Sequence, residues 1–291
     1  MKSIDDMITW LNDDMDRVIK QKPHVENLLR AFKPVILVKY RLLEKVPEKR
    51  TVFQPDKLKC EGGIPLIKQQ ALFFPDDPWR DMAPAITDAI GTGFPHLAAD
   101  MDILSQNIAG GKLDPYDFFR SPAALDEEKI DTGAKALGIA PPALKLFLHV
   151  LGGIILAKRA QDVAGEMATH PWNKGYCPVC GGFPKLAMIR EKGQQWLSCS
   201  QCAHQWRFPR QKCPYCEKES PAETNYMYIE GERDDMAFTC EKCRRYLLTV
   251  NQPGELRETD PDITALSLAH LDLILQDRNF LPMAEGDWTR L

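Results

Sequence analysis

Eight of the nine cysteines in this 291-residue chain fall into four Cys-x-x-Cys pairs, a spacing that is typical of metal binding. Two thiolates separated by two residues can turn toward one ion, and the tight turn directs backbone N–H groups at the sulfur atoms. Two such pairs complete a tetrahedral site of four thiolates, which suits zinc or a single iron. The candidate ligands are Cys177, Cys180, Cys199, Cys202, Cys213, Cys216, Cys240 and Cys243. The pattern predicts two metal ions, each bound by four cysteines.

The intervals between the pairs indicate which pairs share an ion. Eighteen residues separate Cys180 from Cys199 and twenty-three separate Cys216 from Cys240, and either interval is long enough for a hairpin. Only ten residues lie between Cys202 and the next cysteine, Cys213, which indicates a connector. This favours two successive ribbons, one built from the first two pairs and one from the last two. A cross-braced arrangement, in which the first pair shares an ion with the third, is the alternative.

The residues inside the two long intervals have the pattern of hairpins. "KLAMIREKGQQWLSC" is apolar, breaks at Glu191-Lys192-Gly193 and becomes apolar again, and "TNYMYIEGERDDMAFTC" does the same around its own glycine. Gly181 follows the first pair, at a position where a metal-binding Cys-x-x-Cys turn favours a residue that adopts positive φ easily. Glu217 has the corresponding place after the third pair. We therefore expect the first site to be the firmer of the two.

Helices are expected before and after these ribbons in the sequence. Residues 4–19 and 25–46 place apolar side chains at helical spacing, with Pro34 interrupting the second segment. Asp260-Pro261 marks the start of a final helix that runs to about residue 278. We predict an α+β protein with a mainly helical domain over 1–170, four-cysteine ribbons over 171–211 and 212–250, and a C-terminal helix and tail over 251–291.

Charge and hydropathy indicate where the protein acts in the cell and which classes of partner it can bind. The chain carries a net charge of −4 with a pI of about 5.9, so its overall charge gives no general attraction to nucleic acid or to an anionic membrane. The most apolar stretch, residues 144–157, is shorter than the roughly 20 residues of a spanning helix, and we interpret it as a buried core helix. The aspartate-rich N-terminus does not resemble a secretion signal. These features predict a cytoplasmic protein without membrane insertion, whose thiols stay reduced.

The patterns of common catalytic sites are missing from the sequence. It has no glycine-rich phosphate loop, no His-Glu-x-x-His and no nucleophile elbow. Eight cysteines already fill two sites, so His204 is a weaker candidate ligand, and no coordination position stays open for Lewis-acid chemistry. We interpret Cys60 as a structural cysteine, with a reactive thiol as the alternative. The sequence does not predict an enzyme.

A basic and aromatic run between the two ribbons raises a nucleic-acid hypothesis. Arg207, Arg210 and Lys212 lie beside Trp206 and Phe208, which suits a phosphate and a stacked base. However, residues 177–250 contain eleven lysines and arginines against nine acidic residues, which makes no broad basic face. We do not expect nucleic acid to be the partner.

The C-terminal motifs resemble a known family. "CPVCGGFP", "CSQCAHQWRFPRQKCPYC" and "CEKCRRYLL" followed by "DPDITALSLAHLDL" are similar, in this order, to the formate dehydrogenase accessory protein FdhE family. The resemblance extends from about Cys177 to Leu275, and Glu217 departs from it where a glycine is common. The tryptophan and arginine that the family has between the second and third Cys-x-x-Cys pairs correspond to Trp206 and Arg210, and its aromatic residue after the fourth pair corresponds to Tyr246. The resemblance marks these three as candidate partner-binding residues.

The resemblance also implies a function. Members of this family are similar in having a helical domain and two rubredoxin-like ribbons that bind iron, although four thiolates would hold zinc equally well. It implies a cytoplasmic maturation factor that binds the catalytic subunit of a respiratory formate dehydrogenase, a molybdenum or tungsten enzyme, before export. The alternative function is a rubredoxin-like electron carrier. The sequence leaves both a monomer and a homodimer open.

Overall fold

The structure is a computed structural model, and it describes residues 3–120, 126–220, 222–231, 233–252 and 259–284. The chain divides into two compact units. The helical unit comprises the described residues of Met1–Val52 and Gln70–Asp162, and the C-terminal unit comprises those of Phe53–Gln69 and Val163–Gly286. The sequence did not indicate that residues 53–69 group with the C-terminal part.

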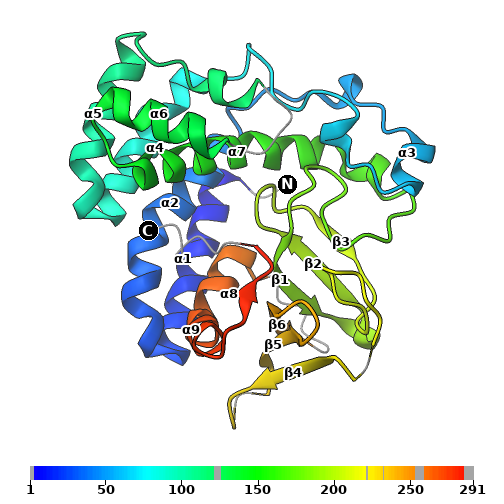
Figure 1. Ribbon diagram of the computed structural model, residues 1–291. Coiled ribbons are helices and arrows are strands. Elements are labelled where there is room, and N and C mark those ends of the chain that lie inside the picture. Colours follow the sequence, from blue (N-terminus) through cyan, green and yellow to red (C-terminus); the bar gives the residue numbers. More distant parts are fainter. Residues whose placement is uncertain (1–2, 121–125, 221, 232, 253–258, 285–291) are drawn as a thin grey trace. The chain divides into compact units, whose positions relative to one another are not determined.

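Six helices build most of the helical unit. They are α1 (Ile4–Gln21), α2 (Glu26–Leu43), α4 (Trp79–Gly93), α5 (Ala98–Ala109), α6 (Glu127–Leu137) and α7 (Pro141–Met167), whose last turn belongs to the C-terminal unit (Figure 1). The start of α1 is fixed by a capping box, in which Ser3 and Asp6 each bond the backbone of the other. The apolar face of α1 is buried through Leu11, Met15 and Val18.

Helix α2 differs from the sequence expectation at Pro34. We expected this residue to interrupt the helix, but α2 continues through it from Glu26 to Leu43. An internal proline removes one hydrogen bond and costs roughly 3 kcal/mol. Residues on both sides of Pro34, including Phe32, Val35 and Val38, are buried, and this packing offsets the cost.

The apolar stretch 144–157 lies in α7, as a buried core helix. Leu144, Phe147, Leu148, Leu151 and Ile155 are all completely inaccessible to solvent. Within the described ranges no single helix is long and apolar enough to cross a membrane. Helices α6 and α7 reach the length and apolar composition of a membrane span only when taken together, and they are bent by 116° relative to each other.

The C-terminal unit contains a seven-stranded sheet. Its strands are β1 (Pro184–Ile189), β2 (Gln195–Cys199), β3 (Gln205–Arg207), β4 (Thr224–Tyr228), β5 (Asp235–Cys240), β6 (Arg245–Asn251) and β7 (Leu281–Pro282). The order is β3-β2-β1-β6-β5-β4, with β7 paired to β6, so β3 and β4 lie at opposite edges (Figure 1). The short helix α3 (Lys57–Glu61) also belongs to this unit.

The two predicted ribbons share this one sheet. Strands β1, β2 and β3 form an antiparallel meander around the first two cysteine pairs, and β4, β5 and β6 repeat it around the last two. The two meanders are joined where β1 runs parallel to β6, with Leu186 beside Leu248 and Met188 beside Val250. The strands that position both cysteine clusters therefore belong to one continuous sheet.

The C-terminal helix is broken in two. We expected one helix from residue 261 to about 278, whereas α8 (Pro261–Ser267) and α9 (Ala269–Asp277) meet at Leu268. Asp260 caps α8 by accepting hydrogen bonds from the backbone of its first turn. The break lets each helix contact its own strand, because Asp262 of α8 pairs with Lys185 of β1 and Asp272 of α9 accepts a hydrogen bond from Tyr246 of β6.

Candidate metal centres

The structure brings the eight paired cysteines together as two clusters. Cys177, Cys180, Cys199 and Cys202 form the first centre, and Cys213, Cys216, Cys240 and Cys243 form the second. Within each centre the four sulfur atoms all lie within 4.8 Å of one another. This is the grouping that successive ribbons predict, and it excludes the cross-braced alternative.

The four Cys-x-x-Cys turns, called knuckles below, share one backbone geometry. The residue after the second cysteine always adopts a positive φ: 76° at Gly181, 55° at Ala203, 56° at Glu217 and 54° at Arg244. Left-handed backbone costs a residue other than glycine roughly 1–2 kcal/mol. Three of the four knuckles therefore keep this conformation although the residue disfavours it.

Hydrogen bonds close the first three knuckles in the same way. The first cysteine donates its N–H to the carbonyl five residues later, at 2.8 Å for Cys177, 3.0 Å for Cys199 and 2.8 Å for Cys213. In the first centre, an N–H inside each turn also points at sulfur, from Val179 to Cys177 Sγ and from Gln201 to Cys199 Sγ, both at 3.4 Å. Such N–H groups stabilise a thiolate.

The first centre is fully enclosed. All four of its cysteines are buried, and its closest sulfur pair, Cys180 with Cys199, is 3.4 Å apart. Burial raises the pKa of Cys177 and of Cys202 well above the usual thiol range. Burial also acts to raise the pKa of Cys199, but hydrogen bonds from the three neighbouring thiols outweigh it and hold this pKa well below the usual range.

The second centre is partly open to solvent. Cys213 and Cys240 are buried, whereas Cys216 and Cys243 are only half-buried. Burial, together with a hydrogen bond to Cys240, raises the pKa of Cys243 to about 12. Glu217 follows the Cys213–Cys216 knuckle, the third along the chain. Its carboxylate forms an ion pair with Lys174 Nζ at 3.1 Å.

Both clusters fit a tetrahedral metal ion. Four sulfur atoms that converge at van der Waals distance form a donor set suited to zinc or a single iron, and four thiolates can stay together away from water only when a cation balances their charge. Four ligands also complete the coordination shell. Either centre is therefore a closed site that could hold a metal ion.

The other residues singled out from the sequence lie in different environments. The indole N–H of Trp206, a residue only 5% exposed, donates to the carbonyl of Lys174 at 3.1 Å. Tyr246 is 1% exposed, and burial followed by its bond to Asp272 raises its pKa. Arg210 is exposed and lies over the ring of Tyr226, 5.6 Å from its centroid. A partner-binding role stays a prediction for all three.

Two further candidates take no part in the clusters. His204 uses its backbone carbonyl to close the second knuckle, is absent from both groups of converging ligand atoms, and has its pKa lowered by burial. Cys60 is 1% exposed and also lies outside both groups. Sequence reasoning missed the segment around Cys60, which contacts the first knuckle, and the glycine pair 62–63 before Ile64 and Pro65 was the available signal.

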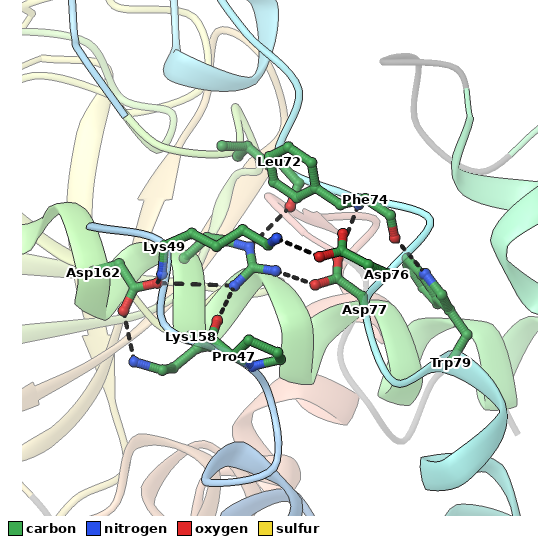
Figure 2. Close-up of polar contacts among 10 residues, drawn as sticks. Pro47, Lys49, Leu72, Phe74, Asp76, Asp77, Trp79, Lys158 and Asp162 are labelled. Carbon is green, nitrogen blue, oxygen red and sulfur yellow. Dashed lines mark hydrogen bonds and ion pairs between the residues drawn. The ribbon is translucent and has the colours of Figure 1, made fainter. Parts of the chain in front are cut away.

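A buried charge cluster lies in the helical unit, away from the cysteines in sequence. Arg159 of α7 is 0% exposed and pairs with Asp77, and it also donates to the carbonyls of Leu72 at 3.2 Å and Pro47 at 2.8 Å (Figure 2). Asp162 accepts from the backbone of Lys49 at 2.8 Å. One turn of α7 thus holds the chain on both sides of residues 53–69.

Comparisons with known proteins give a consistent result. Residues 176–210 match the family model described as FdhE, central domain. The chain is 34% identical over 255 residues to an FdhE homolog of Stutzerimonas stutzeri, which covers 77% of this chain and 80% of that protein. It is 32% identical over 152 residues to an FdhE homolog of Aquifex aeolicus, spanning about half of each chain (50% and 51%).

A solved structure shares the fold. The crystal structure of the FdhE protein from Pseudomonas aeruginosa superposes with a TM-score of 0.61, covering 98% of this chain and 96% of that one. The two sequences are 21% identical, so this likeness concerns the fold.

Proposed function

Since the chain belongs to the FdhE family, we propose that it is a non-catalytic maturation factor for a respiratory formate dehydrogenase. In this proposal it binds the catalytic subunit of that molybdenum or tungsten enzyme in the cytoplasm, before export, and supports its activity. The observation that carries the proposal, beside family membership, is the pair of closed four-cysteine centres. Such centres are suited to holding a binding surface rigid, since no ligand position is left for a substrate.

The proposed cofactors are two ions of iron or zinc, one in each centre. Four thiolates would hold either metal, and a bound ion would supply the cross-link that fixes each pair of knuckles. The chain's own residues supply the rest: backbone N–H groups directed at sulfur and the sheet that orients all four knuckles. Such a cross-link stabilises each ribbon beyond what its share of the common sheet supplies.

One observation favours the alternative of an electron carrier. Two sulfurs of the second centre, those of Cys216 and Cys243, belong to half-buried residues and would be within reach of a redox partner. Iron held by four thiolates can change oxidation state, whereas zinc cannot. The two functions therefore differ in whether the identity of the metal matters.

The identity of the metal provides the experiment. The same preparation is loaded with zinc or with iron, and two quantities are measured: affinity for the catalytic subunit, and formate dehydrogenase activity recovered in extracts of cells that lack the native factor. A maturation factor with structural metal should work equally well in both forms. If the zinc form binds its client normally and recovers no activity, the structural role is wrong and iron chemistry is the function.

We further propose that the client contacts the basic side of the first ribbon. Residues 190–212 contain five lysines and arginines and one acidic residue, in a chain of net charge −4. Two guanidinium groups lie near the ring of Trp196, that of Arg190 at 5.5 Å and that of the exposed Arg207 at 5.7 Å from its centroid. The exposed guanidinium of Arg207 suits an acidic segment of the client, because a guanidinium over an aromatic ring can also bind a carboxylate.

Charge reversal tests this surface. Arg207→Glu/Arg210→Glu should weaken client binding by about tenfold or more, and the loss should shrink at high salt. The matched control is Lys112→Glu/Lys135→Glu, which changes the charge equally at two exposed positions of the helical unit. Equal losses in both variants would show that only overall charge matters, and tight binding by the first variant would remove this surface from the proposal.

A further inference from the structure

Residues 53–69 form a segment whose role neither metal ligation nor client binding explains. The segment belongs to the C-terminal unit, although the chain on both sides of it belongs to the helical unit. It contains α3, the ninth cysteine Cys60 and a 3-10 turn over Leu66–Lys68. The chain therefore leaves one unit, contributes 17 residues to the other and returns.

The end of this segment pairs with the back of the first knuckle. Leu66 donates its N–H to the carbonyl of Pro178 at 2.8 Å, and Ile67 donates to Val179 at 2.9 Å. Pro178 and Val179 are the two residues between the paired cysteines. The knuckle directs the N–H of Val179 at sulfur and its carbonyls outward. The segment therefore donates its hydrogen bonds to these outward carbonyls.

Other contacts hold the same junction. Tyr176, which precedes the first cysteine, donates its hydroxyl to the carbonyl of Gly63 at 2.7 Å. Gly63 has a φ of +78°, a backbone conformation that glycine adopts readily and other residues rarely adopt. Cys60 and Leu66 are 1% and 0% exposed, and Gln69 Nε2 lies 3.6 Å from Cys60 Sγ.

The carbonyls that receive the segment are oriented by the knuckle. The N–H of Val179 points at Cys177 Sγ at 3.4 Å, which turns the carbonyls of the loop away from the sulfur. Gly181 and Gly182 follow, and glycines give the loop little stiffness of its own. An ion shared by four sulfurs would fix this orientation, and its loss would leave the two carbonyls without a fixed direction.

The segment is tied down at both of its bases. Arg159 and its neighbour Asp162 bond Pro47 and Lys49 before the segment, and Leu72 and Asp77 after it (Figure 2). These contacts lie wholly within the helical unit and involve no cysteine. Because both bases are fixed, a released segment stays close to the knuckle and can pair with it again at low entropic cost.

From these contacts we infer that residues 53–69 are a metal-dependent latch. The latch closes on the first knuckle when the first centre holds its ion, and it opens when the ion is lost. The carbonyls that receive it belong to the first centre's knuckle, so loss of the second ion should affect it much less. Because both bases of residues 53–69 stay fixed within the helical unit, opening is confined to these residues. This inference is independent of the client.

The thiol of Cys60 reports the latch. In the full-length protein loaded with zinc, alkylation of Cys60 by iodoacetamide is followed by mass spectrometry of its own peptide, together with amide exchange at Leu66 and Ile67. Cys180→Ser should raise the rate of Cys60 alkylation at least about tenfold, the effect of losing two hydrogen bonds. Cys216→Ser is the matched control in the second centre and should raise the rate much less, because its knuckle reaches the segment only indirectly, through the contacts of Glu217 with Lys174 and Gly175.

A second variant separates latch opening from unfolding of the whole unit. Tyr176→Phe keeps all eight ligands and removes the hydroxyl bond to Gly63, so it should raise Cys60 alkylation about fivefold, as expected for one hydrogen bond, while two equivalents of zinc stay bound. Amides of β5 and β6 serve as internal controls and should stay protected.

Three results would overturn the latch. Cys60 could stay protected in Cys180→Ser, Cys216→Ser could expose Cys60 as strongly as Cys180→Ser, or Tyr176→Phe could have no effect. Should Cys180→Ser expose β5 and β6 as strongly as Cys60, loss of the ion opens the whole sheet and not the segment alone, and the proposed latch is likewise wrong.

Discussion

The two centres use the same knuckle but differ in what surrounds it. The first has four buried cysteines, and its first knuckle is backed by residues 53–69. The second has two half-buried cysteines, and its closest sulfurs are 3.8 Å apart rather than 3.4 Å. Four repeats of one backbone motif thus give two different environments. The surrounding chain, more than the ligand spacing, determines how buried each site is and how closely its sulfur atoms lie.

Backbone strain differs in the same direction. The positive-φ residues are Gly181 and Ala203 in the first centre, and Glu217 and Arg244 in the second. The second centre therefore has one more residue than the first that disfavours this conformation, at roughly 1–2 kcal/mol. Burial and strain together lead us to expect a firm first centre and a labile second one.

The largest expected effect follows the removal of one ligand from each centre. Cys199→Ser and Cys240→Ser should each lower the melting temperature and remove one ion, but Cys199→Ser should lower it further, because the first ion also holds residues 53–69. We expect a difference of about 4 °C or more, since each kcal/mol corresponds to roughly 2–4 °C for a chain of this size. Differential scanning calorimetry with metal analysis measures both. A larger fall for Cys240→Ser would reverse the comparison.

Chelation should reveal the same order in the unaltered protein. Metal release to a chromogenic chelator should be biphasic, with two equivalents in total and a fast phase about tenfold quicker than the slow one, as ~1.4 kcal/mol of strain predicts. Cys216→Ser, which keeps only the first centre, should retain the slow phase. A single phase of two equivalents would make the centres equal, and one equivalent in total would contradict two ions per chain.

The smallest effect concerns Glu217. Glu217→Gly relieves the positive φ but gives up the carboxylate, which contacts Lys174, Lys212 and the N–H of Gly175. The partly exposed pair with Lys174 contributes at most about 1 kcal/mol. We expect a net slowing of release from the second centre by a few-fold. Glu217→Gln is the control, because it removes the charge and keeps the strain, and it should speed release slightly. If Glu217→Gly speeds release as much as Glu217→Gln does, the ion pair matters more than the strain.

The sequence was informative wherever a pattern is local. The cysteine intervals predicted two centres and their hairpins, and the glycine after Cys180 predicted a left-handed residue there. Local patterns could not show that Ala203 and Arg244 adopt the same conformation, because closure of the knuckle imposes it on whatever residue is present. Pro34 was misjudged for a similar reason, since burial of its neighbours outweighs its own preference.

Contacts between distant segments could not be predicted at all. The pairing of Leu66 with Pro178 and the bonds of Arg159 to Pro47 and Leu72 join residues far apart in sequence, and no periodicity marks them. The single sheet is another example, because the parallel pairing of β1 with β6 follows from packing and has no turn to indicate it.

The arrangement of residues 53–69 has a consequence for biosynthesis. During translation Leu66 is made more than a hundred residues before the first knuckle with which it pairs. Likewise, Pro47 precedes its partner Arg159 by 112 positions. The early part of the chain must therefore wait, without its final partners, while the rest is translated. Contacts of such long range slow folding and prolong the exposure of apolar surface. We expect newly made chains to depend on chaperones until the first knuckle has emerged and acquired its ion.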